Sequence, residues 1–172
     1  MDAIQFLLAE HQAVRQRFAE IERAGPQARG ELWHNLQPEL KIHEEIEDTY
    51  LYGPLSRDPA AQGTPLATFE QRQDQDVQQL EQKMRELNRH DPADDAWLAR
   101  LREIRDALME HVRVEEEEIL PQVGQVWGRD RLDLAGRQMA DAKQEAMQSP
   151  ERYAKVLTQP ASRGAMEGGP TR

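Results

Sequence analysis

The apolar residues of this chain recur every three or four positions over most of its length, which is the spacing of one face of an α-helix. Four such stretches cover residues 2–24, 29–52, 65–87 and 95–121, and a shorter one covers residues 131–147. Pro38 interrupts the second stretch, but its apolar stripe continues in register, so we predict a single kinked helix there. The residues that separate the stretches are typical of turns and helix ends: Asp2, Gly25-Pro26, the proline- and glycine-rich segment 53–65, and Asp94 or Asp95.

Four amphipathic helices joined by short or moderate loops predict an all-α fold, an antiparallel up-and-down four-helix bundle over residues 1–127. Residues 128–158 are predicted to form a helical extension that lies across the bundle. Residues 159–172 offer nothing to bury against a core, so we predict a disordered tail there.

Composition narrows the classes of partner and of site. The chain has 172 residues, a net charge of −10 and no cysteine. The negative charge argues against nucleic acid and anionic membranes as partners, and without cysteine neither a disulfide nor a thiolate metal site can form. The first residues lack the basic and long apolar segments of a secretory signal, and no apolar run is long enough to cross a bilayer. We therefore expect a cytoplasmic protein in which nitrogen and oxygen atoms hold any metal.

Two histidine–glutamate pairs interrupt the apolar stripes of the predicted helices. His43 and Glu47 are four residues apart in the second helix, and His111 and Glu115 repeat the spacing in the fourth, so each pair projects from one helix face. His11 lies in the middle of the first stripe. Burying two carboxylates costs several kcal/mol each unless cations offset them. The five residues together predict a shared metal site, and imidazole with carboxylate suits iron, manganese or zinc.

The other two histidines are predicted to lie on the surface. His34 is half a turn out of phase with His43, and His90 falls in the turn before the fourth helix. Glu31 and His34 spell the ExxH motif of ferritin-type di-iron bundles, but that architecture needs two inward-facing copies and the chain has one.

These segments resemble the hemerythrin-like HHE cation-binding proteins, whose fold is a four-helix bundle around a non-haem di-iron centre. The resemblance spans residues 4–126 through AEHQAVRQRF, LKIHEEIEDTYLYGPL and HVRVEEEEILPQV, and both HxxxE segments carry a trailing proline. It implies two iron ions per chain, one bound by His11 and His43 and the other by His111. It also implies that Glu47 and Glu115 bridge the two ions.

The predicted third helix departs from this family, which usually takes one or two histidines from it, because here it has none. Glu70 is our first candidate for a substitute ligand, the neutral Gln73 the second and Asp74 the third. Carboxylate or amide donors in place of imidazole would stabilise ferric iron, which works against reversible oxygen binding. They would also leave the second iron weakly held.

Two further residues near the second pair have open interpretations. Glu44 is a reserve carboxylate ligand, and it is equally well explained as a solvated side chain beside Glu45. Tyr50, one turn beyond Glu47, is placed to bond a ligand carboxylate or to approach a metal, although packing in the core explains it better.

The leading hypothesis is a metal-binding protein with a carboxylate-bridged di-iron site that binds or reacts with dioxygen, peroxide or nitric oxide. Catalase-like or oxidase-like turnover would fit an oxygen-rich ligand set, but no additional acid, base or nucleophile stands out. One alternative is an iron- or redox-sensing or metal-storage module without turnover, in which zinc or manganese is also compatible with the donors. Another is a metal-free bundle in which the altered third helix marks a degenerate site.

Overall fold

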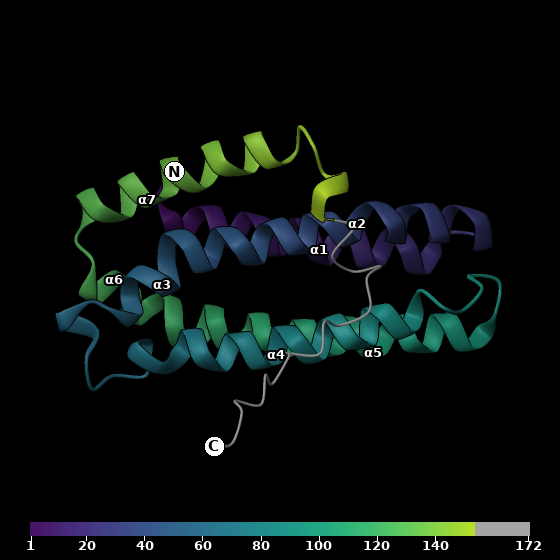
Figure 1. Cartoon of the computed structure of the whole chain (residues 1–172), viewed down its shortest axis with the longest axis horizontal. Coiled ribbons are helices and arrows are strands. Elements are labelled where there is room, and N and C mark those ends of the chain that lie inside the picture. The colour runs from purple at the N-terminus through teal and green to yellow at the C-terminus, as the bar shows by residue number, and fades with distance from the viewer. Residues whose placement is uncertain (154–172) are drawn as a thin grey trace, which may run out of the picture.

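The computed structural model describes residues 1–153, and within that range it contains helices and turns but no β-strand. Four long helices pack as two pairs, α1 (Ala3–Arg23) with α2 (Pro26–Glu47) and α4 (Leu66–Leu87) with α5 (Asp95–Val114). Successive long helices run in opposite directions (Figure 1), which confirms the predicted antiparallel bundle. The predicted tail and the end of the predicted extension lie outside the described residues.

Local sequence accounts for the helix ends. Asp2 caps α1 by accepting a hydrogen bond from the backbone N–H of Gln5 at 2.8 Å, and the Gln5 side chain accepts the Asp2 backbone N–H at 3.2 Å. Pro26 opens α2, since a proline at the first position of a helix gives up no intrahelical bond. The helix then continues through Pro38, so the second stretch is one helix, as predicted.

Each histidine–glutamate helix widens into a π-turn at its glutamate. After α2 comes η1 (Asp48–Tyr52) and then α3 (Gly53–Ser56), while α5 leads into η3 (Glu115–Ile119) and α6 (Leu120–Val126). The Gly53 N–H donates to the Asp48 carbonyl, five residues back, and the Leu120 N–H donates likewise to the Glu115 carbonyl. A proline follows both donors, and it has no N–H with which to continue the α-helical pattern.

The segment predicted as a loop, residues 53–65, is therefore helical in part. It contains α3 and the short 3₁₀ turn η2 (Pro59–Ala61). The prediction was wrong there because Pro54 sits in the first turn of α3, where the missing N–H is tolerated. Gly53 also permits a close approach that a side chain would not, since a Cβ there would lie 2.7 Å from the Asp48 carbonyl oxygen.

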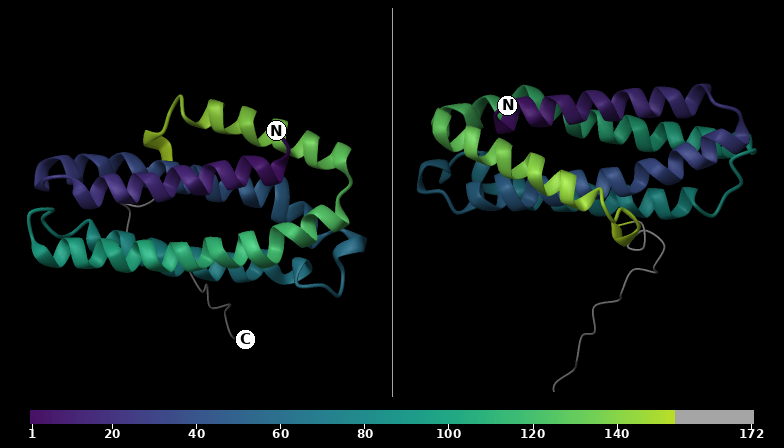
Figure 2. Two further views of the ribbon diagram at one scale, coloured as in Figure 1. Left: turned by 180° about the vertical axis from the view of Figure 1, so that it is seen from behind. Right: turned by 90° about the horizontal axis from the view of Figure 1, so that it is seen from above.

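The C-terminal helix α7 (Arg129–Ala146) runs obliquely over the outer face of the α1–α2 pair (Figure 2). Gly136 allows this contact, because a Cβ at that position would lie 2.5 Å from the Asp2 backbone carbon. Lys143 pairs with Glu10 of α1. Backbone contact and charge pairing thus hold α7 against the start of α1.

Buried apolar residues form two clusters along the bundle. The four-helix core is built from α1, α2, α4 and α5 alone, and it contains Val14, Phe18, Ile21, Trp33, Leu36, Leu40, Met84, Leu87, Trp97, Leu101 and Ile104. The second cluster, the α7 core, includes Leu132, Ala135 and Met139 of α7, with Phe6, Leu7, Ile46, Leu51, Tyr52, Phe69 and Ile119 among its other members. No helix within residues 1–153 has the length and apolar character needed to span a membrane.

Candidate metal centre

Four of the predicted ligands meet between the two cores. His11 comes from the middle of α1, His43 and Glu47 from the last turns of α2, and Glu115 from the first position of η3. The exposed fractions of His11, Glu47 and Glu115 are 1%, 2% and 0%. Polar groups that are this well removed from water need partners inside the protein or a bound ion.

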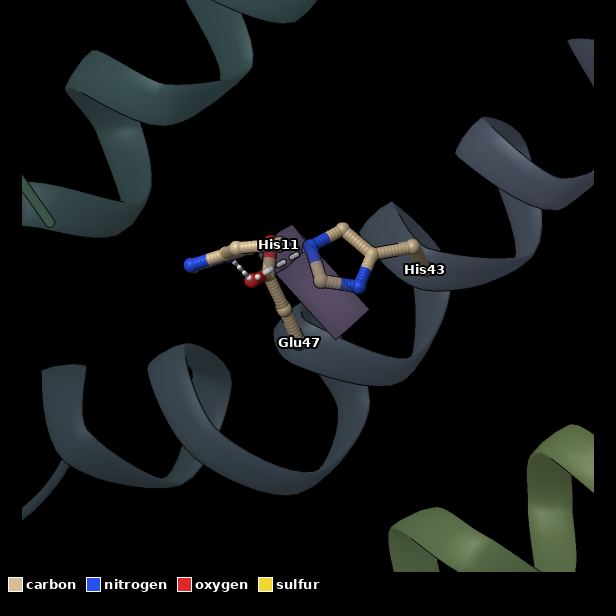
Figure 3. A group of neighbouring side chains, drawn as sticks. All are labelled: His11, His43 and Glu47. Atoms are coloured by element: carbon tan, nitrogen blue, oxygen red, sulfur yellow. Dashed lines mark ion pairs between the residues drawn. The ribbon is translucent and has the colours of Figure 1, made fainter. Parts of the chain in front are cut away.

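Figure 3 shows His11, His43 and Glu47 with their donor atoms turned toward one another. The His43 Nε2 atom lies 3.0 Å from Glu47 Oε1, and the His11 Nε2 atom lies 3.6 Å from the same oxygen. His11 Nε2 also lies 3.2 Å from Glu115 Oε2. One donor atom from each of His11, His43 and Glu47 falls within 4.8 Å of the others, which is a spacing that one metal ion can bridge.

A second layer of side chains orients the cluster. The His11 Nδ1 atom lies 2.9 Å from Glu116 Oε1, and the other oxygen of Glu116 accepts a hydrogen bond from Arg15 at 2.8 Å. With its proton on Nδ1, His11 would direct the lone pair of Nε2 to a cation held between it, Glu47 and Glu115. An imidazole bonded to a carboxylate in this way is the usual arrangement of a metal-binding histidine. Nothing in the sequence singles out Glu116 for this role, because the run Glu115–Glu118 has the pattern of a solvated helix face.

The two buried carboxylates have further donors. Gln73 of α4 donates from Nε2 to Glu47 Oε2 at 2.9 Å, and the Tyr52 hydroxyl donates to Glu115 Oε1. Tyr52 is fully buried and packs edge-on against Phe69, with ring centroids 4.8 Å apart. The π-turn η1 accounts for this contact, because five residues complete one wide turn and bring Tyr52 to the face that carries Glu47. In a regular α-helix Tyr50 would lie nearer that face.

The charges in the cluster are mutually dependent. Burial alone would lower the pKa of His11, but Glu115 and Glu47 outweigh it and raise that pKa to about 10. Burial and the charge of Glu47 raise the pKa of Glu115. Burial would also raise the pKa of Glu47, but His43 and His11 outweigh it and lower that pKa. The two acids thus draw positive charge to the space between them, which is the role that a bound cation would take.

The hydrogen bonding of the donor atoms also fits a metal ion. His11 Nε2, Glu47 Oε1 and Glu115 Oε2 are buried and make no hydrogen bond within the described residues. Orphaned buried polar atoms are uncommon in folded proteins, and here three from three different segments converge. Two imidazoles and two carboxylates suit iron, manganese or zinc.

His111 stands apart from the four convergent residues. Its Nδ1 atom lies 3.6 Å from Asp76 Oδ2 of α4, and its ring stacks on Phe69 with centroids 6.2 Å apart. It nevertheless lines the same cavity as His43 and Glu47. The structure therefore brings His111 to the edge of the cluster rather than into it.

Of the three candidate ligands in α4, the one that reaches the cluster is not the one ranked first from the sequence. Glu70 lies beside Asp48, where burial and the charge of Glu70 raise the pKa of Asp48, and near Gly53, outside the cluster, and Asp74 is exposed. Gln73, the second candidate, is the residue that reaches Glu47. Glu70 was preferred for its charge, but the helix phase turns its carboxylate toward η1, so we propose no ligand role for it.

The remaining sequence candidates have ordinary surroundings. Glu44 pairs with Lys41 at 2.9 Å, and burial raises its pKa to about 7 against the opposing effect of Lys41. Tyr50 is half-buried against the α7 core. His34 is exposed and His90 lies near Glu86 in the α4–α5 connection, so both lie away from the cluster, as predicted.

The sequence was compared with profiles of known protein families. Residues 2–123 match the sequence profile of the hemerythrin HHE cation binding domain, and this range contains every residue of the cluster. The chain belongs to this family. No curated protein sequence is significantly similar to this HHE chain.

A solved structure supports the fold of this HHE protein. The chain is similar to the crystal structure of a hemerythrin HHE cation binding domain-containing protein from Mycobacterium kansasii. The two chains are 21% identical in sequence, and their structures superpose with a TM-score of 0.72. The match covers 92% of this chain and 97% of the other. Since the family profile ends at residue 123, the similarity in fold must extend into α7.

Proposed function

We propose that this HHE protein binds two iron ions per chain and that the loaded centre binds or reacts with dioxygen, peroxide or nitric oxide. The observation that carries the proposal is the convergence of His11 Nε2, Glu47 Oε1 and Glu115 Oε2, which are buried without hydrogen bonds. In this proposal His11 and His43 bind one ion, and Glu47 and Glu115 bridge both. His111, at the edge of the same cavity, binds the other ion.

The chain's own residues prepare the centre for such a ligand. Two carboxylate-bridged metal ions supply positive charge that can hold and polarise a small ligand. Glu116 keeps the His11 ring oriented, and Gln73 and Tyr52 hold one oxygen each of Glu47 and Glu115. The apolar cores flank the cluster at both ends, while the cavity lined by His43, Glu47 and His111 leaves it open on one side to a small ligand.

A second candidate function follows from the contacts of the third helix. Gln73 offers a neutral amide where an imidazole would bind strongly, and the contact of His111 with Asp76 competes with metal binding. A weakly held second ion favours a sensing or storage role, in which occupancy rather than turnover is the output.

Metal analysis after aerobic purification from cells supplied with iron tests the proposal. About two irons per chain and a near-ultraviolet oxo-iron band that changes on adding peroxide or nitric oxide are the expected result. About one iron per chain, or zinc with no spectral response, would favour the sensing or storage function. Protein that takes up no metal even when iron is added after purification would refute both.

A further inference from the structure

A cavity of about 300 Å³ lies between α2, α4 and α5, directly beside the metal cluster. His43, Glu47 and His111 border its inner end. Arg72, Lys83 and Ala107, which also line it, are exposed, so the cavity reaches the surface.

The cavity is too large for the ligands of the proposed function. A water molecule occupies roughly 30 Å³ of liquid, so this space corresponds to about ten waters, whereas a diatomic gas needs the room of one or two. The volume lies at the lower end of the range of small-molecule sites in proteins. It therefore fits an organic molecule rather than a gas.

The lining of the cavity is apolar along its length. Val77, Leu80 and Met84 follow Gln73 on one face of α4, with Leu40 of α2 and Leu108 of α5 lining the same cavity. Gln73 and Met84 are eleven residues apart, which in an α-helix corresponds to about 16 Å. The cavity thus offers an elongated apolar surface that begins at the polar cluster.

The lining holds five acids and three Lys or Arg side chains, and two of these cations have no acidic partner in the described part of the chain. Every acid in the lining lies within ion-pair distance of a basic side chain, as shown by the pairs Glu44–Lys41, Glu47–His43, Asp76–His111, Glu81–Lys41 and Glu110–Arg113. Arg72 and Lys83 also line the cavity, yet neither has an ion-pair partner within residues 1–153. Arg72 precedes Gln73 and so lies at the cluster end.

From the size, apolar length and free cations of this cavity, we propose that it binds a medium-chain monocarboxylic acid. The carboxylate lies near Arg72 at the cluster end, and the hydrocarbon chain extends along Val77, Leu80 and Met84. This inference goes beyond the proposed function and does not depend on which metal is bound. Screening by salt limits the repulsion between the ligand and the overall charge of −10.

Calorimetric titration of the purified protein with hexanoate, octanoate and decanoate tests the proposal. Affinity should rise about fourfold for each methylene that enters the apolar surface. Equal affinities along the series, or no binding of decanoate, would overturn it. Iron content is measured on the same samples, so the titration stands even if the proposed di-iron function fails.

Two substitutions locate the ligand. Arg72→Gln should weaken decanoate about three- to tenfold and leave the neutral 1-decanol unaffected, because only the acid uses the guanidinium. Ala107→Trp should weaken both compounds at least about tenfold by filling the cavity. The matched controls are Arg89→Gln and Ala99→Trp, which change exposed residues outside the lining.

The controls also make the placement falsifiable. Decanoate binding that is unchanged in Ala107→Trp would show that the acid binds elsewhere. An equal loss in Ala99→Trp would show that the effect is a general one on the fold. An Arg72→Gln protein with normal decanoate affinity would show that the carboxylate of the acid does not lie near Arg72.

Discussion

Buried polar groups occur both in the four-helix core and in the metal cluster, but their partners differ. In the four-helix core, the Gln37 side chain bonds the Trp33 carbonyl at 3.4 Å and accepts from Asn88 at 2.7 Å, and Asn88 accepts from Trp33 Nε1 at 2.8 Å. In the cluster, His11 Nε2 and its facing carboxylate oxygens make no such bonds. A satisfied polar network stabilises a fold, whereas converging unsatisfied atoms indicate a ligand.

The largest expected effect is in the four-helix core. Trp97→Ala should lower the free energy of unfolding by about 3–5 kcal/mol, because it removes a large side chain that is buried between helices. Urea denaturation followed by circular dichroism measures this. Iron content per folded chain should be unchanged, and a loss of metal as large as that in the cluster variants would contradict the separation of the two regions.

A substitution in the cluster should instead lower metal affinity more than stability. Glu115→Ala should weaken metal binding by at least about 100-fold, since removing a supporting side chain alone typically costs 10–100-fold. Metal analysis and competition with a chelator measure the affinity. His34→Ala, which changes an exposed histidine, should retain metal, and an equal loss there would refute the assignment of the inward face of α2.

The π-turn is tested by comparing two tyrosines. Tyr52→Phe should destabilise the protein by about 1.5–3 kcal/mol, because the buried Glu115 loses a hydrogen bond from the hydroxyl. Tyr50→Phe should change stability by less than about 0.5 kcal/mol. Thermal or urea unfolding of both variants measures these losses of stability. A larger loss in Tyr50→Phe than in Tyr52→Phe would indicate that the chain continues as a regular α-helix and that Tyr50 is the partner of Glu115.

The smallest expected effect concerns the support of His11. Glu116→Ala should lower metal affinity by about 10- to 100-fold, because the His11 ring loses the partner of its Nδ1 atom. Glu117→Ala alters a neighbouring exposed glutamate and should have no effect on metal affinity. Equal affinities of the two variants would show that Glu116 does not orient His11.

Much of the architecture could be read from the sequence because it depends on regular periodicity. The four long helices and the inward positions of His11 and Glu47 follow from the 3.6-residue repeat, and the Asp2 cap follows from the residue type at the helix start. One prediction failed where that repeat changes, since the start of the predicted loop is the short helix α3. The preceding π-turn brings Tyr52, which the sequence did not single out, to a buried carboxylate, while Tyr50 packs against the α7 core as favoured.

The third helix shows a different limit. The apolar stripe of α4 already places Gln73 at its centre and Glu70 and Asp74 to its sides. Glu70 was ranked first because its carboxylate is the stronger ligand, but the structure follows the helix phase and brings Gln73 to Glu47.

The sequence by itself determined the helices, their apolar faces and the presence of histidine and glutamate on those faces, because each is a property of spacing along one chain segment. Only the tertiary structure decided which of these polar atoms meet, that Glu116, Tyr52 and Gln73 support them, and that His111 stays at the edge. Those outcomes depend on helix rotation and on two π-turns, where a change of one residue per turn redirects every side chain that follows.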